Sequence, residues 1–421
     1  MSVNHCKYLV VGGGVSGLMF ANLVKSDDFI LLEKESELGG FCRTIYQDGF
    51  IWDYAGHFFH FANEEIKSFF KSKIADDAFV LKDKVTKIFY QDSVVDFPFQ
   101  TNIHQLEKEE FIECLYDLYF REEKEVYDSF LDMLYGKFGK SITEKFLKPY
   151  NEKLYACDLN SLDTDAMGRF FPYANLEQII RNFKQQYQGS YNSTFLYPKK
   201  GAKVFVDALA QDLPVENVFL QEQVVSIDAK AKIAVTTHRR ISYDYLINSM
   251  PLNRFLSTID DIDYQHFVDR LSWNKVLVFN LGFDKGSTYD EVHWAYFPEK
   301  KYNFYRVGFY NNILDDERLS LYVEIGYGPN DDINVDAQLA ATLEGLKDAG
   351  IITDHHLLSS CHIVMDPAYV HVNSELSGVK DEVKSDLESM GIYSIGRYGD
   401  WKYCSIEDSM LDAINVAKKI A

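Results

Sequence analysis

The chain has 421 residues, of which 47% are hydrophobic and 15% aromatic, and its formal net charge at pH 7 is −21. A chain of this length exceeds what one hydrophobic core usually organises, so we expect two or three subdomains. So large a negative charge argues against non-specific binding to nucleic acid and against stable docking on an anionic membrane. An anionic ligand would need arginines that locally reverse the field of the whole protein.

The six cysteines are scattered, without the pairs or nearby histidines that are typical of a zinc site. We therefore expect reduced, structural thiols and no metal. The chain begins MSVNHCK and passes directly into a strand pattern, with neither a signal-peptide pattern nor an apolar run of membrane-spanning length. These features favour a cytoplasmic protein.

The first predicted elements are a strand over residues 7–12, a helix over 16–25 and a strand over 29–33. A strand, turn, helix and strand in this order typically open a doubly wound nucleotide-binding domain. Residues 84–99 predict two strands around the turn YQDS. Residues 104–190 are predominantly helical in pattern, and we expect the glycines of YGKFG to end a long helix.

The second half of the chain returns to mixed patterns. An α/β pattern covers residues 197–250, and apolar strand runs dominate residues 275–327. The last thirty residues predict a strand (IYSIG), a loop and an amphipathic helix. We find no internal repeat or linker, which favours subdomains that are discontinuous in sequence.

A glycine-rich turn follows the first strand, where Gly12, Gly14 and Gly17 fit G-x-G-x-x-G. The first glycine allows a tight turn, the second lets backbone approach a pyrophosphate, and the third lets helix pack on strand. Glu33 ends the second strand, where a carboxylate accepts hydrogen bonds from ribose hydroxyls; a solvated glutamate is the alternative. The predicted dinucleotide contacts are Gly12, Gly14, Val15, Ser16, Gly17, Glu33 and Lys34.

A second glycine pair lies in ELGGFCRT, residues 37–44. This stretch resembles the second glycine box of FAD-dependent amine-oxidase-like flavoproteins, whose backbone runs along the extended cofactor. The resemblance implies FAD rather than NAD and adds Gly40 and Arg43 to the predicted cofactor contacts. A surface turn with an arginine is the alternative.

The segment WDYAGHFFH, residues 52–60, follows. In the same superfamily, an aspartate, a glycine and a histidine in such a segment lie beside the flavin ring. The resemblance implies that Gly56 and His57 contact the flavin, with His57 near its N5 atom. We expect His60, with its apolar neighbours, to be structural.

Later segments resemble one branch of this superfamily, the UDP-galactopyranose mutases. DFPFQTN, residues 96–102, is similar to the Y-P-F-Q-N-N segment of the eukaryotic-type mutases, whose glutamine meets the uracil. This implies substrate contacts for Gln100 and for Phe97, which stands where the family has a tyrosine. A surface turn after a strand remains the alternative.

Two longer segments extend the resemblance. Residues 138–171 are similar to a helical segment of the mutases and imply that Arg169 reaches the substrate diphosphate. Residues 293–312 resemble their H-W-x-Y-F-P…F-Y-R segment, which implies substrate roles for Tyr296 and Arg306. A strand that buries its own aromatic side chains explains less well an arginine there, because burial without an anion would be costly.

GRYGDWKYCSIEDSMLDA, residues 396–413, resembles the C-terminal G-R-x-G-x-[WY]-x-Y of the mutases. This implies that Gly396 and Arg397 contact the flavin region and that Tyr403 binds phosphate. Val224 and Ser405 complete the predicted cofactor contacts. The chain departs from the family at residues 404–407, so the nucleotide and the sugar stay open.

The resemblance implies an α/β fold in which a Rossmann-type FAD-binding domain is joined to an antiparallel β-sheet substrate domain and a helical insertion. The expected boundaries are 1–60, 195–250 and 386–421 for the FAD-binding domain, 61–103 and 251–385 for the sheet domain, and 104–194 for the helical domain.

For a mutase, the resemblance implies that N5 of reduced FAD attacks the anomeric carbon and displaces the nucleoside diphosphate, after which the sugar changes ring size. The substrate would be UDP-galactose or a related nucleotide sugar, with NAD(P)H or another reductant as the electron source. A homo-oligomer is compatible with this assignment. An FAD-dependent oxidase or dehydrogenase and a non-catalytic flavin-binding protein are the alternatives. The residues with implied catalytic roles are His57, Arg169, Arg306 and Tyr403.

Overall fold

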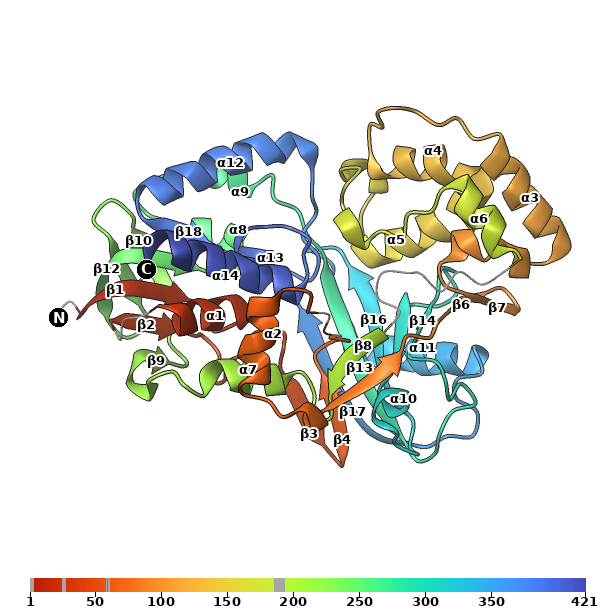
Figure 1. The fold of residues 1–421 in the computed structure, drawn as a ribbon, viewed down its shortest axis with the longest axis horizontal. Coiled ribbons are helices and arrows are strands. Elements are labelled where there is room, and N and C mark those ends of the chain that lie inside the picture. The colour runs from red at the N-terminus through yellow and green to blue at the C-terminus, as the bar shows by residue number, and fades with distance from the viewer. Residues whose placement is uncertain (1–3, 25–27, 58, 60, 185–193) are drawn as a thin grey trace.

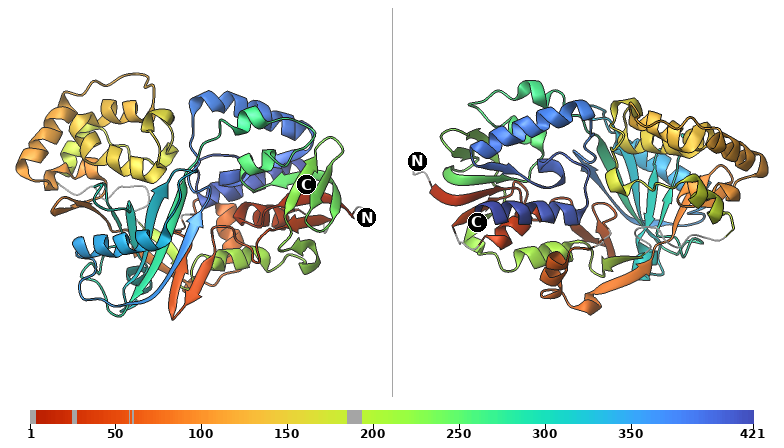
Figure 2. Two further views of the ribbon diagram at one scale, coloured as in Figure 1. Left: turned by 180° about the vertical axis from the view of Figure 1, so that it is seen from behind. Right: turned by 45° about the horizontal axis from the view of Figure 1, so that its top comes forward.

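The structure is a computed structural model that describes residues 4–24, 28–57, 59, 61–184 and 194–421. His60, residue 25 of the first predicted helix and residues 185–190 of the predicted helical stretch lie outside the described residues. In Figure 1 the first sheet and its helices lie at the left, the second sheet lies in the middle, and a group of helices lies beside the second sheet at the upper right. The two views of Figure 2 keep the same order, and both chain ends lie at the first sheet.

The first sheet has a parallel centre. Its strands run in the order β10-β11-β12-β1-β2-β9, and β18 also pairs with β12. All neighbouring pairs are parallel except β10–β11 and β11–β12. The strands are β1 (Asn4–Val11), β2 (Phe29–Leu32), β9 (Val218–Phe219), β10 (Val224–Asp228), β11 (Ile233–Thr236), β12 (Arg240–Asn248) and β18 (Ile392–Ser394).

Helices cover both faces of the first sheet. Alternate residues of a strand point to opposite faces, and in β1 both sets are apolar, so each face packs against helices. Tyr8 and Val10 of β1 pack in one core with α1, α2, α7 and α14, whereas Leu9 and Val11 pack in another with α8, α9 and α12. The helices are α1 (Val15–Leu23), α2 (Glu64–Lys71), α7 (Lys203–Ala210), α8 (Leu252–Leu256), α9 (Gln265–Val268), α12 (Ser374–Ser389), α13 (Gly396–Gly399) and α14 (Ile406–Ile420).

The second sheet is antiparallel except for one pair. Its order is β17-β13-β16-β15-β14-β6-β7, and only β14 and β6 run parallel within these described strands. The α/β fold with a mixed parallel sheet and a mostly antiparallel sheet is therefore confirmed. The strands are β6 (Thr86–Tyr90), β7 (Ser93–Asp96), β13 (Lys275–Phe283), β14 (Trp294–Tyr296), β15 (Arg306–Phe309), β16 (Ser320–Tyr327) and β17 (Leu357–Met365).

The two faces of this sheet differ in character. Phe279, Val307 and Val323 point to one face, where they form an apolar core with α11 (Val335–Asp348). The neighbouring positions Arg306 and Glu324 point to the other face. Alternation with a period of two thus places the polar side chains of β15 and β16 on a single face, which we call the site face.

The helical group contains α3 (Lys108–Tyr119), α4 (Phe130–Ile142), a π-helical turn (Thr143–Leu147), α5 (Lys148–Tyr155) and α6 (Leu176–Asn182). Gly139 of YGKFG has a φ of 74° and a ψ of 174°, so the helical backbone is interrupted there and α4 consists of two helical stretches joined at a kink. A Cβ atom at Gly139 would lie 2.5 Å from the carbonyl oxygen of Asp117, so α3 and α4 approach closely there. The first stretch therefore ends at YGKFG, as expected, and a second begins directly after the glycine.

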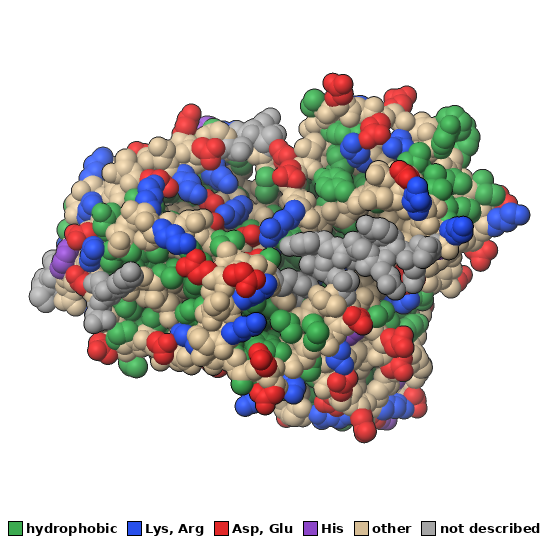
Figure 3. All heavy atoms as spheres, viewed as in Figure 1, with side chains coloured by type: hydrophobic (Ala, Val, Ile, Leu, Met, Phe, Trp, Pro, Cys, Tyr) green, Lys and Arg blue, Asp and Glu red, His purple; other side chains and the backbone are tan. Residues whose placement is uncertain are grey.

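One face of α3 is apolar and open to solvent. Ile112, Tyr116, Tyr119 and Phe120 repeat at helical spacing, and each is about half exposed or more. Figure 3 shows hydrophobic side chains gathered over this helical group. Among the described residues, no helix combines the length and the apolarity needed to cross a bilayer.

Two short antiparallel strand pairs lie between the two sheets. They are formed by β3 (Thr44–Gln47) with β4 (Phe50–Asp53) and by β5 (Phe79–Asp83) with β8 (Thr194–Pro198), and α10 (Tyr310–Leu314) lies next to β5.

Asp53, at the end of β4, is fully buried and holds these parts together. Its carboxylate accepts hydrogen bonds from the Thr44 hydroxyl (2.6 Å), the Tyr197 hydroxyl (2.8 Å) and the Ala202 N–H (2.9 Å). Its backbone carbonyl accepts a bond from the side-chain amide of Asn280 in β13 (3.1 Å). Burial raises the pKa of Asp53 to about 6. One residue therefore ties α7 of the first sheet to the second sheet.

Asp53→Ala would leave three buried donors without an acceptor. Each such donor costs about 1–3 kcal/mol, so we expect the free energy of unfolding to fall by about 3 kcal/mol or more. Urea denaturation measures the change. Asp83→Ala, which removes an exposed carboxylate from β5, is the matched control and should cost less than about 0.5 kcal/mol. Similar losses for the two variants would contradict the assigned role.

His371 predicts a pH dependence of stability. Its Nε2–H donates to the Tyr155 carbonyl (3.0 Å), its Nδ1 lies 2.5 Å from the Ser272 hydroxyl, and burial lowers its pKa to about 4. The unfolded chain takes up a proton at this ring below about pH 6.5, whereas the folded protein does not. The contribution of His371 to the free energy of unfolding is therefore fully present above pH 6.5 and is lost as the pH falls towards 4.

We expect His371→Gln to lessen the loss of unfolding free energy between pH 7 and pH 5 by about 1–2 kcal/mol, measured by urea denaturation at both pH values. His356→Gln replaces an exposed histidine and serves as the control. An unchanged difference between the two pH values in the His371 variant would contradict the prediction.

Candidate active site

The first glycine box contains two glycines that the fold itself requires. Gly12 has a φ of +103°, and a Cβ atom there would lie 2.5 Å from the Ser249 hydroxyl oxygen. A Cβ atom at Gly17 would lie 2.1 Å from the Gly12 carbonyl oxygen. Gly14 differs, because no heavy atom lies within 4 Å of its missing Cβ. It precedes α1, so the open space lies at a helix N-terminus, which suits a phosphate group.

The second glycine box lies directly against the first. The Gly39 N–H donates to the Gly13 carbonyl (2.8 Å), and Gly14 and Gly39 form a bridge. A Cβ atom at Gly40 would lie 3.5 Å from the Gly14 Cα. The two glycine pairs therefore form one backbone surface without side chains, as an extended dinucleotide requires.

Glu33 is buried beside this surface. Its carboxylate accepts the N–H of Gly13 (2.8 Å) and of Glu35 (2.9 Å), which leaves lone pairs for a ribose hydroxyl. The Glu222 N–H donates to the Glu33 carbonyl (2.9 Å), so the start of β10, with Val224, lies nearby. Lys34 is exposed and pairs with Glu35.

Two buried polar atoms near the second box and the following segment lack a hydrogen-bond partner among the described residues, although Arg43 Nε lies 3.8 Å from the Glu37 carboxylate. The Arg43 guanidinium donates to the Glu37 carbonyl (2.6 Å), but its Nε makes no hydrogen bond in the described structure. Nδ1 of His57, next to half-buried Gly56, is likewise unpaired there. Unpaired buried polar atoms beside an open backbone surface fit a bound polar cofactor such as FAD.

Burial, together with the charges of Arg397 and Arg306, lowers the pKa of His57 to about 4. The ring is therefore neutral at pH 7. Arg397 donates through Nε and Nη2 to the Cys404 carbonyl (3.1 and 2.5 Å), and its guanidinium lies 5.0 Å from the centre of the Tyr403 ring. His57, Arg397 and Tyr403 thus belong to one neighbourhood.

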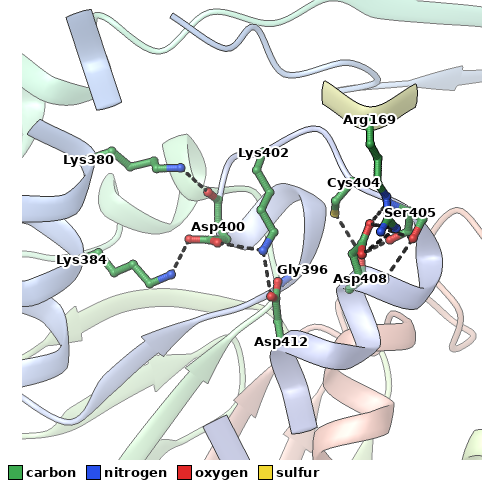
Figure 4. A network of polar contacts seen from close by, with 11 residues as sticks. Arg169, Lys380, Lys384, Gly396, Asp400, Lys402, Cys404, Ser405, Asp408 and Asp412 are labelled. Atoms are coloured by element: carbon green, nitrogen blue, oxygen red, sulfur yellow. Dashed lines mark hydrogen bonds and ion pairs between the residues drawn. The ribbon is translucent and has the colours of Figure 1, made fainter. Parts of the chain in front are cut away.

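The C-terminal segment is anchored by ion pairs and a helix cap (Figure 4). Asp412 accepts the Gly396 N–H (3.0 Å) and pairs with Lys402. A Cβ atom at Gly396 would lie 2.2 Å from the Ser16 hydroxyl oxygen, so this segment packs tightly on α1. Lys380, Lys384 and Lys402 surround Asp400.

Residues 404–407, where the chain departs from the mutase pattern, have defined structural roles. Ser405 caps α14 and forms a capping box with Asp408. Glu407 is buried and accepts the N–H groups of Ala62 (2.7 Å) and Asn63 (2.6 Å), which lie just beyond the His57 segment. The Cys404 carbonyl holds Arg397. These residues therefore shape the backbone around the expected flavin ring.

Arg306 forms a buried ion pair. Its Nε and Nη2 donate to the two carboxylate oxygens of Glu324 at 2.6 and 2.8 Å, in a two-bond arrangement, and Glu324 is 1% exposed. The buried arginine does have an anion, as its burial requires, and Glu324 of the same chain supplies it. Glu324 stands within the apolar run LYVEIGY, an acidic residue that strand alternation alone could have singled out.

Tyr369 connects Arg306 to the flavin side of the site. Its hydroxyl lies 3.5 Å from Nη2 of Arg306, and its ring stacks on Tyr403 with centres 6.0 Å apart. The resemblance had not pointed to Tyr369, which lies two residues after Pro367 in a segment without a recognisable motif.

Tyr296 and Phe97 extend the site face. The Tyr296 hydroxyl accepts a hydrogen bond from Trp294 Nε1 (3.0 Å), and its ring packs edge-to-face on Phe97 at 5.1 Å. Gln100 is fully buried; its Nε2 donates to the Pro172 carbonyl (2.5 Å), whereas its Oε1 has no partner in the described structure.

Arg169 lies apart from Arg306. Its side chain is 53% exposed, and it donates to both carboxylate oxygens of Asp408 at 2.9 and 3.0 Å (Figure 4). Phe170 packs on Tyr403, so Arg169 borders the same neighbourhood. In this arrangement its charge is already balanced by Asp408.

A cavity of about 620 Å³ opens elsewhere, between β4 and α10. Phe50, Tyr310 and the acidic turn 315–317 border it, and none of the predicted site residues does. We therefore do not assign it to the candidate active site.

Comparison with known proteins identifies the family. The family model of flavin-containing amine oxidoreductases matches residues 15–417. A solved structure of reduced UDP-galactopyranose mutase has a TM-score of 0.92 and 23% identity, and the match covers 99% of this chain and 93% of that one. A putative protoporphyrinogen oxidase from Exiguobacterium sp. 255-15 has a TM-score of 0.79 and 17% identity, with 100% and 99% of the chains covered.

A corticosteroid-binding protein from Candida albicans is 25% identical over 272 residues, which are 58% of this chain. The match covers 52% of that relative, so the chain spans about half the length of the curated protein it matches. The likeness to the solved structures shows the fold, whereas the family model covers nearly the whole chain. The chain therefore belongs to the family of flavin-containing amine oxidoreductases, which implies a flavin cofactor.

Proposed function

We propose that the protein is a flavin-dependent mutase that interconverts the pyranose and furanose forms of a nucleotide sugar, UDP-galactose or a close relative. The grouping of Arg306 and Arg397 with the tyrosines 296, 369 and 403 beside neutral His57 carries this proposal. In a chain of net charge −21, such a grouping offers hydrogen-bond donors and local positive charge to a diphosphate.

The same grouping disfavours an amine as substrate. An amine is positively charged at neutral pH, and the guanidinium groups that would face it cannot lose their protons. The likeness in fold to the reduced UDP-galactopyranose mutase is consistent with an anionic substrate in this position.

The residues of the site have different roles in the proposed reaction. When bound in its reduced form, FAD supplies a nucleophilic N5 atom for the anomeric carbon. Arg306, oriented by Glu324, holds the diphosphate both when it departs and when it returns. Burial raises the pKa of Tyr403 to about 12, so its hydroxyl stays protonated and donates to a phosphate oxygen. Neutral His57 adds no charge beside the flavin.

Arg169 has a conditional role in this proposal. It must exchange the Asp408 carboxylate for a phosphate oxygen before it can contact the substrate. Phe97 packs on Tyr296, and Gln100 is held by the Pro172 carbonyl; both are assigned to the nucleotide.

The direct test is anaerobic incubation of the dithionite-reduced holoenzyme with UDP-galactofuranose, followed by chromatography, with other nucleotide furanoses in parallel. We expect conversion to the pyranose form without consumption of reductant, because the flavin acts as a nucleophile and is regenerated. The control is the same enzyme with oxidised flavin, which should be inactive. Oxygen-dependent turnover of an amine, with no isomerisation of any nucleotide sugar, would contradict the proposal and favour an oxidase.

The Arg306–Glu324 pair provides a second test. Arg306→Ala should lower kcat/KM by orders of magnitude while FAD stays bound, but it also leaves Glu324 buried without its counter-ion, which costs about 3–5 kcal/mol. The double variant Arg306→Met, Glu324→Gln removes both charges, so we expect it to be well folded and equally inactive. Activity and thermal unfolding are measured together.

Arg318→Ala, which removes an arginine paired with Asp316 away from the site face, is the control for a lost guanidinium. It should retain wild-type turnover. Near-normal activity of the double variant would exclude Arg306 from the reaction.

A further inference from the structure

Lys84 is a cation of the site face to which neither a motif nor the resemblance had pointed. It lies between β5 and β6, and its ammonium is 5.0 Å from the Trp294 ring centre and 5.6 Å from that of Phe97. These two rings flank Tyr296, by a hydrogen bond from Trp294 and an edge-to-face contact with Phe97. The ammonium therefore reaches the surface on which the substrate residues lie.

The backbone next to Lys84 is fixed from both sides by His293. The Val85 N–H donates to Nδ1 of His293 (3.1 Å), and the His293 N–H donates to the Val85 carbonyl (2.9 Å). Burial lowers the pKa of His293 to about 4, so its Nδ1 remains an acceptor at pH 7. Lys84 therefore projects from backbone whose position is fixed just before the start of β6.

Lys84 differs from its neighbours in having no acidic partner. Lys82 pairs with Asp315 (2.6 Å) and Lys87 with Asp96 (2.5 Å), whereas no hydrogen bond or ion pair joins Lys84 to any part of the chain that the structure describes. Burial and the charge of Arg306 lower its pKa to about 8. An anion between Lys84 and Arg306 would relieve both effects.

The balance of charges in the site is consistent with such an anion. Arg306 is balanced by Glu324 and Arg169 by Asp408, whereas Lys84 and Arg397 have no carboxylate partner among the described residues. A nucleoside diphosphate ester carries two negative charges. Lys84 offers this ester a positive charge that no carboxylate among the described residues already balances.

We propose that Lys84 is a substrate-binding residue whose ammonium pairs with the diphosphate of the nucleotide sugar, together with Arg306. This inference rests on the proposed function, and it adds a lysine to the arginines that bind the substrate diphosphate. The Lys84 ammonium already lies against the Trp294 and Phe97 rings, so it has little freedom to lose on binding.

The test is calorimetric titration of the flavin-loaded protein with UDP and, separately, with uridine. Lys84→Met removes the charge and keeps the stem. We expect it to weaken UDP binding by about 10- to 100-fold, the worth of a hydrogen bond between charged groups, and to leave uridine binding unchanged. Lys84→Arg should restore UDP affinity to within a few fold, and Lys82→Met, which removes a paired surface charge, is the matched control.

A second readout separates binding from folding. Lys84 has no ion pair to lose, so Lys84→Met is expected to unfold at the same temperature as the wild type or at a higher one. If Lys84→Met binds UDP as tightly as the wild type, or weakens UDP and uridine equally, the role of Lys84 is overturned and the proposed function stands. If the wild type binds none of UDP, dTDP and GDP, the proposed function fails and the inference with it.

Discussion

The Asp53 carboxylate is the interaction on which the arrangement of the site depends. It is fully buried, accepts three hydrogen bonds from β3, β8 and the residue before α7, and its own carbonyl receives the amide of Asn280 from the second sheet. The glycine surface for the dinucleotide belongs to the first sheet, whereas Arg306 and Tyr296 belong to the second. The proposed reaction would need both, and the contacts of Asp53 at the end of β4 set the position of one relative to the other.

Charge compensation is the second constraint. The chain carries a net charge of −21, yet its candidate site gathers arginines, a lysine and tyrosines. Burying such cations would be costly, and the fold meets that cost at Arg306 by pairing it with buried Glu324. Arg169, whose side chain is 53% exposed, pairs with Asp408. Under the proposed function, a diphosphate would either bind the unbalanced cations or displace a carboxylate. Glu324 and Asp408 would then compete with the substrate for the two arginines.

The sequence predicted local features well. The glycine boxes, the first strands and the C-terminal helix depend on residues close together in the chain, and their spacing carries the geometry. The ion pairs did not follow from the sequence, since Arg169 and Asp408 are 239 residues apart and Arg306 meets Glu324 only through the register of β15 with β16. Nothing in the sequence separates Lys84 from Lys82 and Lys87. Only the folded chain shows that two of these three lysines have acidic partners.

The departure at residues 404–407 has a physical consequence for specificity. Ser405 and Asp408 satisfy the first turn of α14 with their own side chains, and Glu407 binds the N–H groups of Ala62 and Asn63 beyond the His57 segment. The loop thus uses its polar groups to hold backbone and presents few of them to a sugar. Under the proposed function, recognition of sugar hydroxyls would then fall to the group formed by Tyr296, Trp294 and the Lys84 ammonium. Differences in substrate between this chain and the mutases it resembles should accordingly map to that group.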